Sequence, residues 1–283
     1  MLSIPETDSP SVPATGTLLL YSQTFEPGQL SSTGSSVVKQ TFKNLSANRT
    51  SFCYYPRTGS SLGYQFNLPI NTNGTLVISH PLPTSTASFG DTMKRTRISG
   101  TLDAGSPAGI FTDTNGIYFC RRNGFYIRTR MRRVTNGPHS RGTILMLAQA
   151  FGSGYQPSQA HDSIGFTYDT TDVFPSNYFL HTRNGADEGA NLTKWDLGSG
   201  APRNDEQVYD ASFYCAPSAS VIHALLINIT SGTQNVVFNT AITGNLPDMN
   251  ALMFAEINAS PGSGSDAPQV GQILECMFIE GFY

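Results

Sequence analysis

Three arginines at alternate positions of one short segment are the sharpest chemical feature of this sequence. Arg128, Arg130 and Arg132 lie in the run GFYIRTRMRRV (124–134), whose β-branched and aromatic residues predict a strand. Alternate residues of a strand point to the same face of a sheet, so the three guanidinium groups should form a row. Each guanidinium presents a fork of N–H donors that suits phosphate or carboxylate. We therefore name these arginines as candidate contacts to an anion or to a partner.

Several ligands would suit this row, and the sequence leaves the choice open. Phosphate contact by basic residues is the first sign of a nucleic-acid site. However, few aromatic residues apart from Tyr126 interleave with the arginines, and the chain has a net charge of −3, so we expect no nucleic-acid partner. The phosphates or acidic sugars of a surface glycan or lipopolysaccharide are a second alternative. A third is a solvated face, or ion pairs with carboxylates of an adjacent subunit.

Trp195, the single tryptophan of the chain, is a candidate for stacking against a sugar ring. An exposed aromatic face buries apolar surface of the sugar at a low entropic cost. The alternative is that Trp195 anchors the protein core. Tyrosines that would accompany it are Tyr155, Tyr168, Tyr178, Tyr209 and Tyr214.

Carboxylates are frequent in the second half of the chain, and we expect them mainly in loops. They include Asp162, Asp169, Asp172, Asp187, Glu188, Asp196, Asp205 and Glu206. A glycosidase would need two carboxylates about 5–10 Å apart across a cleft, whereas Asp residues in turns mostly cap the backbone. The 5 histidines share no metal-like spacing, and no P-loop, GxSxG or GxGxxG motif occurs. We therefore expect no catalytic residue, no metal and no cofactor.

The elements that carry these residues are predicted to be strands almost throughout. From Tyr118 to Tyr283, short runs rich in β-branched and aromatic residues alternate with Gly, Pro, Asn, Asp and Ser. The clearest runs are 124–134, 143–151, 163–168, 177–182, 208–216, 221–230, 236–242 and 272–283. His223 lies in the apolar run VIHALLINIT and is expected to be a core or interface residue. We predict an all-β fold, an antiparallel, jelly-roll-like β-sandwich.

Composition and charge fit this fold class. Only 13% of the residues are charged, while Gly (27) and Pro (17) are abundant, as is typical of turn-rich all-β proteins, including extracellular and virion proteins. Residues 1–141 hold 14 basic and 6 acidic residues, a balance of +8, and residues 142–283 hold 3 and 14, a balance of −11. This asymmetry would favour contacts between neighbouring subunits, unless folding interleaves the two signs on one surface.

We divide the chain into three segments. Residues 1–36 form an extended N-terminal anchor arm, residues 37–115 a small β-rich middle segment, and residues 116–283 the C-terminal sandwich. Strands expected in the middle segment are SFCYY (51–55), GYQFNL (63–68), TLVISH (75–80) and MKRTRISGTL (93–102).

The arm is expected to be extended because its Pro-, Ser- and Thr-rich start buries little apolar surface. The strand TLLLY (17–21) makes Leu18, Leu20 and Tyr21 the candidate anchor residues, and a turn with a loose connector follows at 25–36. The start of the chain lacks the apolar core of a signal peptide, and no long apolar run predicts membrane insertion.

Three stretches resemble tailed-bacteriophage virion appendage proteins, of the fibre, tail or head-decoration type, with an N-terminal anchor and a C-terminal β-sandwich. VPATGTLLLYSQTFEPGQLSSTGSS (12–36) looks like their anchor segment. KRTRISGTLDAGSPAGIF (94–111), before the aromatic GFY (124–126), is similar to the passage that introduces their sandwich. The order DSIGFTYD, NYFLHTRNGA, YDASFYCAPSAS and a closing ECMFIEGFY resembles the sandwich itself. Two departures are the sequence LYSQTFEPGQL, where an Asp-Gly hairpin is typical, and the long arm before it.

The resemblance implies a non-enzymatic structural component of a virion, assembled in the host cytoplasm. It implies a homotrimeric fibre or spike that docks to other virion proteins through its N-terminal arm and presents the sandwich to the host surface, with a glycan as the expected ligand. Two other functions stay open. One is a capsid cement or decoration protein that stabilises contacts between capsomers, and the other is a glycan depolymerase.

Overall fold

The structure is a computed structural model that describes residues 19–23, 26–30, 49–54, 74–79, 96–102, 108–111, 118–135, 141–150, 160–169, 176–185, 192–203, 207–260 and 269–282. Within these ranges every regular element is a β-strand, apart from one short 3₁₀ turn at Gly198–Gly200. No helix in this part of the chain is long and apolar enough to cross a membrane. The predicted all-β fold is confirmed.

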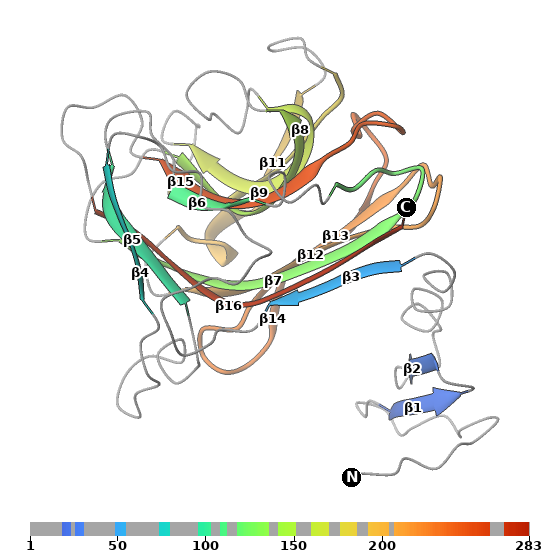
Figure 1. The fold of residues 1–283 in the computed structure, drawn as a ribbon, viewed down its shortest axis with the longest axis horizontal. Helices are drawn as coiled ribbons and strands as arrows, with labels where there is room; N and C mark the ends of the chain where they lie inside the picture. The colour runs from blue at the N-terminus through green and yellow to red at the C-terminus, as the bar shows by residue number, and fades with distance from the viewer. Residues whose placement is uncertain are drawn as a thin grey trace.

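Two antiparallel sheets form a β-sandwich of jelly-roll type (Figure 1). The six-stranded sheet has the order β11 (Leu192–Asp196), β10 (Phe179–Arg183), β9 (His161–Asp169), β8 (Arg141–Ala150), β15 (Phe254–Ser260) and β6 (Ala108–Phe111). The eight-stranded sheet has the order β14 (Asn235–Ile242), β13 (Ile222–Asn228), β12 (Val208–Cys215), β7 (Phe125–Thr135), β16 (Gln269–Phe282), β5 (Thr96–Leu102) and β4 (Gly74–Ser79), with β3 (Arg49–Tyr54) also paired to β16.

The core lies between the two sheets and is built by alternate residues of their strands. Along β7, Phe125, Ile127 and Met131 are buried in it. Phe166 of the six-stranded sheet stacks on Phe213 of the eight-stranded sheet, with ring centroids 5.0 Å apart and an interplanar angle of 11°. Such an aromatic pair adds roughly 0.5–1.5 kcal/mol beyond the burial of its area, so these rings help to hold the sheets together.

The predicted runs of the C-terminal segment correspond to β7, β8, β9, β10, β12, β13, β14 and β16. The run pattern misses β11 and β15, because LTKWD and FAEINAS contain charged and small residues and few β-branched ones. Both are strands because their neighbours pair with them: Leu180 lies opposite Trp195, and Phe254 opposite Ala148. Pairing and packing in the sandwich override the weak local preference.

Strands from the predicted middle segment belong to both sheets. β3 and β5 pair with β16, β4 pairs with β5, and β6 pairs with β15. Residues 37–115 and 116–283 therefore share the two sheets. The strand predicted at 63–68 lies outside the described residues.

The arm contains an antiparallel pair of short strands, β1 (Leu19–Gln23) and β2 (Glu26–Leu30). The strand predicted at 17–21 is confirmed by β1, which contains Leu20 and Tyr21, while Leu18 lies outside the described residues. The prediction of a turn and a loose connector at 25–36 is wrong for the segment EPGQL, which forms β2. Pro and Gly lower the strand preference of this segment, yet its backbone pairs in register with β1, with Gly28 opposite Tyr21.

The two sheets differ in their outer faces. On the six-stranded sheet several side chains that point away from the core are buried, and those of Met146, His181 and Arg183 are 0% exposed. On the eight-stranded sheet, outward side chains of β7 and β13 such as Arg128 and His223 are exposed. The eight-stranded sheet therefore presents exposed polar side chains on its outer face.

Candidate ligand-binding face

Seven side chains on the outer face of the eight-stranded sheet form the candidate site, which we call the platform. They are Tyr126, Arg128, Arg130, Asp210, Ser212, Tyr214 and His223. They share one face because each alternates along its strand with residues of the core, such as Ile127 on β7 and Phe213 on β12. The alternation that buries one half of these strands therefore presents the other half outwards.

The pairing register arranges the platform in three rows across β7, β12 and β13. The rows are Tyr126–Tyr214–His223, Arg128–Ser212 and Arg130–Asp210. Neighbouring strands lie about 4.8 Å apart, and successive residues on one face lie about 7 Å apart along a strand. A row of rings therefore lies directly beside two rows that carry charge and hydrogen-bonding groups.

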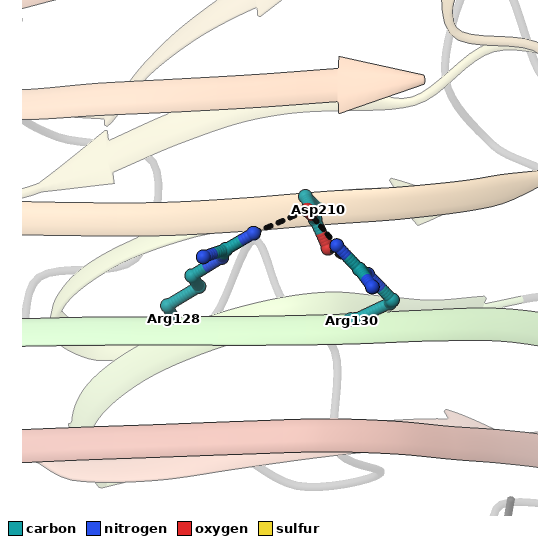
Figure 2. A network of polar contacts seen from close by, with 3 residues as sticks. All are labelled: Arg128, Arg130 and Asp210. Carbon is teal, nitrogen blue, oxygen red and sulfur yellow. Dashed lines mark hydrogen bonds and ion pairs between the residues drawn. The ribbon is translucent and has the colours of Figure 1, made fainter. Parts of the chain in front are cut away.

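Asp210 forms ion pairs with two arginines of β7, Arg128 and Arg130 (Figure 2). Arg130, directly opposite on the neighbouring strand, donates from Nε to Oδ1 at 2.6 Å and from Nη2 to Oδ2 at 2.7 Å. Arg128 lies opposite Ser212 and reaches diagonally to donate from Nη2 to Oδ2 at 2.6 Å. Hydrogen bonds between ionised groups are roughly twice as strong as neutral ones, and the two-bond contact of Arg130 also fixes its direction.

Asp210 keeps its negative charge in this arrangement. Burial by itself raises the pKa of the carboxyl group, since the side chain is only 4% exposed. The hydrogen bond from Arg130 and the charge of Arg128 outweigh burial and hold the pKa below its usual value. The carboxylate therefore serves as a fixed anchor that orients both guanidinium groups.

Arg128 keeps hydrogen-bonding capacity on the solvent side. Its side chain is 45% exposed, and one of its five N–H groups is used in the bond to Asp210. Arg130 is more covered, with 27% of its side chain exposed. The two guanidinium groups and the carboxylate of Asp210 together carry a net charge of +1.

The aromatic row supplies flat apolar surface beside this charge. The rings of Tyr214 and His223 stack at 6.0 Å between centroids with an interplanar angle of 26°. Tyr126 lies directly opposite Tyr214 on the other side. Tyr126 and Tyr214 are half-buried and His223 is exposed, so the rings are accessible from solvent. Of the two positions expected for His223, core or interface, the core is excluded, because the side chain is exposed on the outer face of the eight-stranded sheet.

The predicted arginine row is on one face of β7, but its members differ in accessibility. Arg132 lies on the same face, opposite Val208, and is only 9% exposed. The carboxylate partner of Arg128 and Arg130 belongs to the same chain, rather than to an adjacent subunit. Here folding interleaves positive charge from the first half of the sequence with negative charge from the second.

Sequence reasoning missed Asp210 and grouped Tyr214 with the wrong partners. Trp195 lies on β11 in the six-stranded sheet and packs, partly buried, against the core, and Tyr168 and Tyr209 are core residues. The available signal was the alternation of Asp210 with apolar neighbours in the run VYDASFYC, because a lone carboxylate in a buried strand requires a partner.

His181 is the centre of a buried polar group on the other sheet. Its Nε2 is 3.2 Å from Ser163 Oγ, and its Nδ1 is 3.1 Å from Thr167 Oγ1. Complete burial, with the positive charges of Lys194 and Arg183, lowers the pKa of His181 from its usual 6.5 to about 3. The imidazole is therefore neutral at physiological pH, and its 0% exposure makes it a structural group rather than a contact for a ligand.

Three of the carboxylates predicted for loops lie at strand positions instead. Asp162 and Asp169 are in β9, and Asp196 is in β11; the remaining five lie outside the described residues. Asp162 Oδ1 accepts hydrogen bonds from the backbone N–H groups of Gly185 at 3.0 Å and Asp248 at 2.7 Å, which ties two loops to β9. No group of three or more His, Cys, Asp or Glu side chains that could hold a metal ion occurs in the described part of the chain.

No family model matches this chain, and no curated protein matches it in sequence. Among solved structures, it is similar to the endo-β-1,4-glucuronan lyase from the fungus Trichoderma reesei, with a TM-score of 0.52 and 8% identity over 82% of this chain and 95% of the lyase chain. At this identity the likeness shows the β-sandwich fold alone.

Two further matches have TM-scores below 0.5. Peanut lectin matches with a TM-score of 0.49 and 11% identity, over 83% of this chain and 98% of the lectin chain. A carbohydrate esterase from the Shiga toxin-encoding bacteriophage phi24B matches with a TM-score of 0.47 and 12% identity, over 83% of this chain and 100% of the esterase chain.

Proposed function

We propose that this chain is a non-enzymatic component of a bacteriophage virion that binds a host-surface glycan through the platform. In this proposal it is a homotrimeric fibre or spike, docked to other virion proteins through residues 1–36 and displaying the sandwich outwards. The resemblance of residues 12–36 and 94–111 to virion appendage proteins supports the virion role. The platform supports the glycan role.

The observation that carries the glycan role is the row of accessible rings beside arginines held by Asp210. A sugar ring has an apolar C–H face and a rim of hydroxyl groups, so it suits an aromatic surface with adjacent hydrogen-bond donors. Because Asp210 holds Arg128 and Arg130 in place, little side-chain freedom is lost when a ligand binds. The surface is therefore preorganised for a ligand of this shape.

The non-enzymatic part of the proposal is supported by the structural roles of three polar side chains. Asp210 is bound by two arginines, Asp162 holds two backbone N–H groups, and His181 is buried and neutral. Each of these groups has a structural role, whereas a glycan depolymerase needs an acid and a base that face a bound sugar.

A capsid cement or decoration role is the second candidate. Apolar side chains next to the platform favour it: Leu225 and Ile227 on β13 are half-buried, and Val236 on β14 is 56% exposed. Ile227 lies opposite both Asp210 and Val236, so this apolar patch continues the Arg130–Asp210 row. A protein neighbour would cover apolar surface of this kind.

The experiment is binding of the purified full-length protein to an array of neutral and acidic bacterial oligosaccharides, in parallel with the His223→Ala variant. We expect binding by the wild type and its loss in the variant, because the exposed ring of His223 forms one end of the aromatic row. Absence of binding to every oligosaccharide would refute the glycan role. Specific binding of the same protein to virion particles would then favour the cement role.

A further inference from the structure

We propose that the platform selects an acidic saccharide, with a carboxylate, sulfate or phosphate ester bound by Arg128 while the neighbouring sugar ring stacks on Tyr214 and His223. This inference rests on the proposed glycan-binding function and names the class of glycan. It is drawn from the charge, the donor capacity and the spacing of the platform.

Asp210 is the one carboxylate among the seven platform side chains, and two guanidinium groups share it. Arg128 and Arg130 share this one carboxylate, and Arg130 takes both of its oxygens. Ser212, Tyr214 and His223 carry no carboxylate, and on the other side of β7 the strand β16 places Phe278 opposite Arg128 and Glu280 opposite Tyr126. A ligand anion bound by Arg128 would gain charge-assisted hydrogen bonds from a guanidinium group that shares its carboxylate with Arg130.

Arg128 has the geometry to receive that anion. Its Nη2 is held by Asp210, so the guanidinium plane is fixed at one end, as Figure 2 shows. Its side chain is 45% exposed, so the remaining N–H groups are available on the solvent side. A planar fork of donors favours an anion with two or more oxygens over a single hydroxyl group, because two parallel hydrogen bonds form at once.

The position of Arg128 relative to the rings matches a saccharide that carries its charge on a substituent. Arg128 follows Tyr126 by two residues on the same face, which is about 7 Å along the strand. The rings of Tyr126, Tyr214 and His223 span two strand spacings, about 10 Å, which is enough for roughly two sugar rings. A sugar stacked on Tyr214 would therefore place an acidic substituent within reach of Arg128.

The test compares two polysaccharide probes that differ only in their acidic group: polygalacturonate oligosaccharides and the same oligosaccharides with their carboxyl groups reduced. Isothermal titration calorimetry of the full-length protein measures binding of each. The variant Arg128→Gln removes the charge and leaves Asp210 paired to Arg130. The matched control is Arg122→Gln, which removes one exposed positive charge outside the platform and changes the net charge equally.

We expect the wild type to bind the acidic probe at least about tenfold more tightly than the reduced probe. Arg128→Gln should abolish this preference by lowering binding of the acidic probe to that of the reduced probe, and Arg122→Gln should keep the preference. Rising salt should weaken binding of the acidic probe only. His223→Ala should weaken binding of both probes, because stacking does not depend on the acidic group.

Three results would overturn the inference. Equal binding of the two probes, or a preference that survives in Arg128→Gln, would refute acidic selection and leave the glycan-binding function standing. No binding of either probe, together with no binding on the oligosaccharide array, would refute both. If sedimentation shows that Arg128→Gln or His223→Ala dissociates a wild-type oligomer, the platform is a contact between copies of this chain, and both proposals fail.

Discussion

Arg130 and Asp210 form a two-bond ion pair across β7 and β12, with Nε–Oδ1 at 2.6 Å and Nη2–Oδ2 at 2.7 Å, although 80 residues separate them in the sequence. The pair is directly opposed in the sheet register, so each strand fixes the position of the other's charged side chain. Because Arg128 joins the same carboxylate, this contact both stabilises the sheet and orients the platform.

Replacing Asp210 by Asn should destabilise the protein by about 2 kcal/mol, because two guanidinium groups lose an ionised partner. The partial exposure of Arg128 and Arg130 keeps the effect below that of a fully buried pair, since solvent screens their charge. Urea unfolding measures the loss, with Ser212→Ala on the same face of β12 as the control. Equal unfolding midpoints for wild type and Asp210→Asn would show that the ion pairs contribute no net stability.

Stability should fall as the pH is lowered from about 6.5, through His181. Its pKa in the folded protein is about 3, against 6.5 when exposed, so between these values the unfolded state binds a proton that the folded state does not. Unfolding is therefore favoured by up to about 1.4 kcal/mol for each pH unit of the decrease. Above pH 6.5 the imidazole is neutral in both states, and the effect vanishes.

The measurement is the free energy of unfolding of wild type and His181→Gln between about pH 7 and pH 4.5, since Asp210 loses its own contribution only at lower pH. Glutamine retains groups that can hydrogen-bond to Ser163 and Thr167 but does not titrate. A difference between the two proteins that stays constant with pH would contradict this account of His181.

Gly124→Ala should destabilise the protein by about 1–3 kcal/mol through overpacking and backbone strain. Gly124 immediately precedes β7 and has a φ of +76°, and an added Cβ would lie 2.8 Å from Pro217 N and 2.9 Å from Cys215 O. Gly244→Ala is the matched control, because a Cβ there would meet nothing within 4 Å. Thermal unfolding of both variants measures their losses of stability. Similar losses would show that the close contacts of a Cβ at position 124 do not destabilise the protein.

Removal of residues 1–35 should leave a trimer if the sandwich carries the assembly and the arm serves for docking. Sedimentation equilibrium of the full-length chain and of a chain that starts at Ser36 measures both masses. Dissociation after truncation would place residues 1–35 in the oligomer interface and refute the docking role of the arm. If both proteins are monomers, the cement role is favoured, because the copies would then assemble only on the virion.

Most strands could be predicted from the local sequence pattern, and the strands that this pattern misses share one physical cause. β7 and β13 carry β-branched and aromatic residues at high density, so their tendency to form strands is local. β11, β15 and β2 have weak patterns and are strands because a neighbour supplies their hydrogen-bonding partner. Trp195 shows the same limit for a side chain: its ring packs on the core because of where β11 is placed.

For the platform, the sequence by itself determined that Arg128 and Arg130 share a face of one strand and that Ile127 occupies the other. That result needs only the two-residue period of an extended chain. Which residues meet those arginines was decided by the tertiary structure alone. Asp210 and Tyr214 come from β12 and His223 from β13, and their register with β7 depends on the burial of every alternate residue in a common core. Strand pairing across such sequence distances is set by the packing of the whole sandwich, and the local sequence pattern does not indicate it.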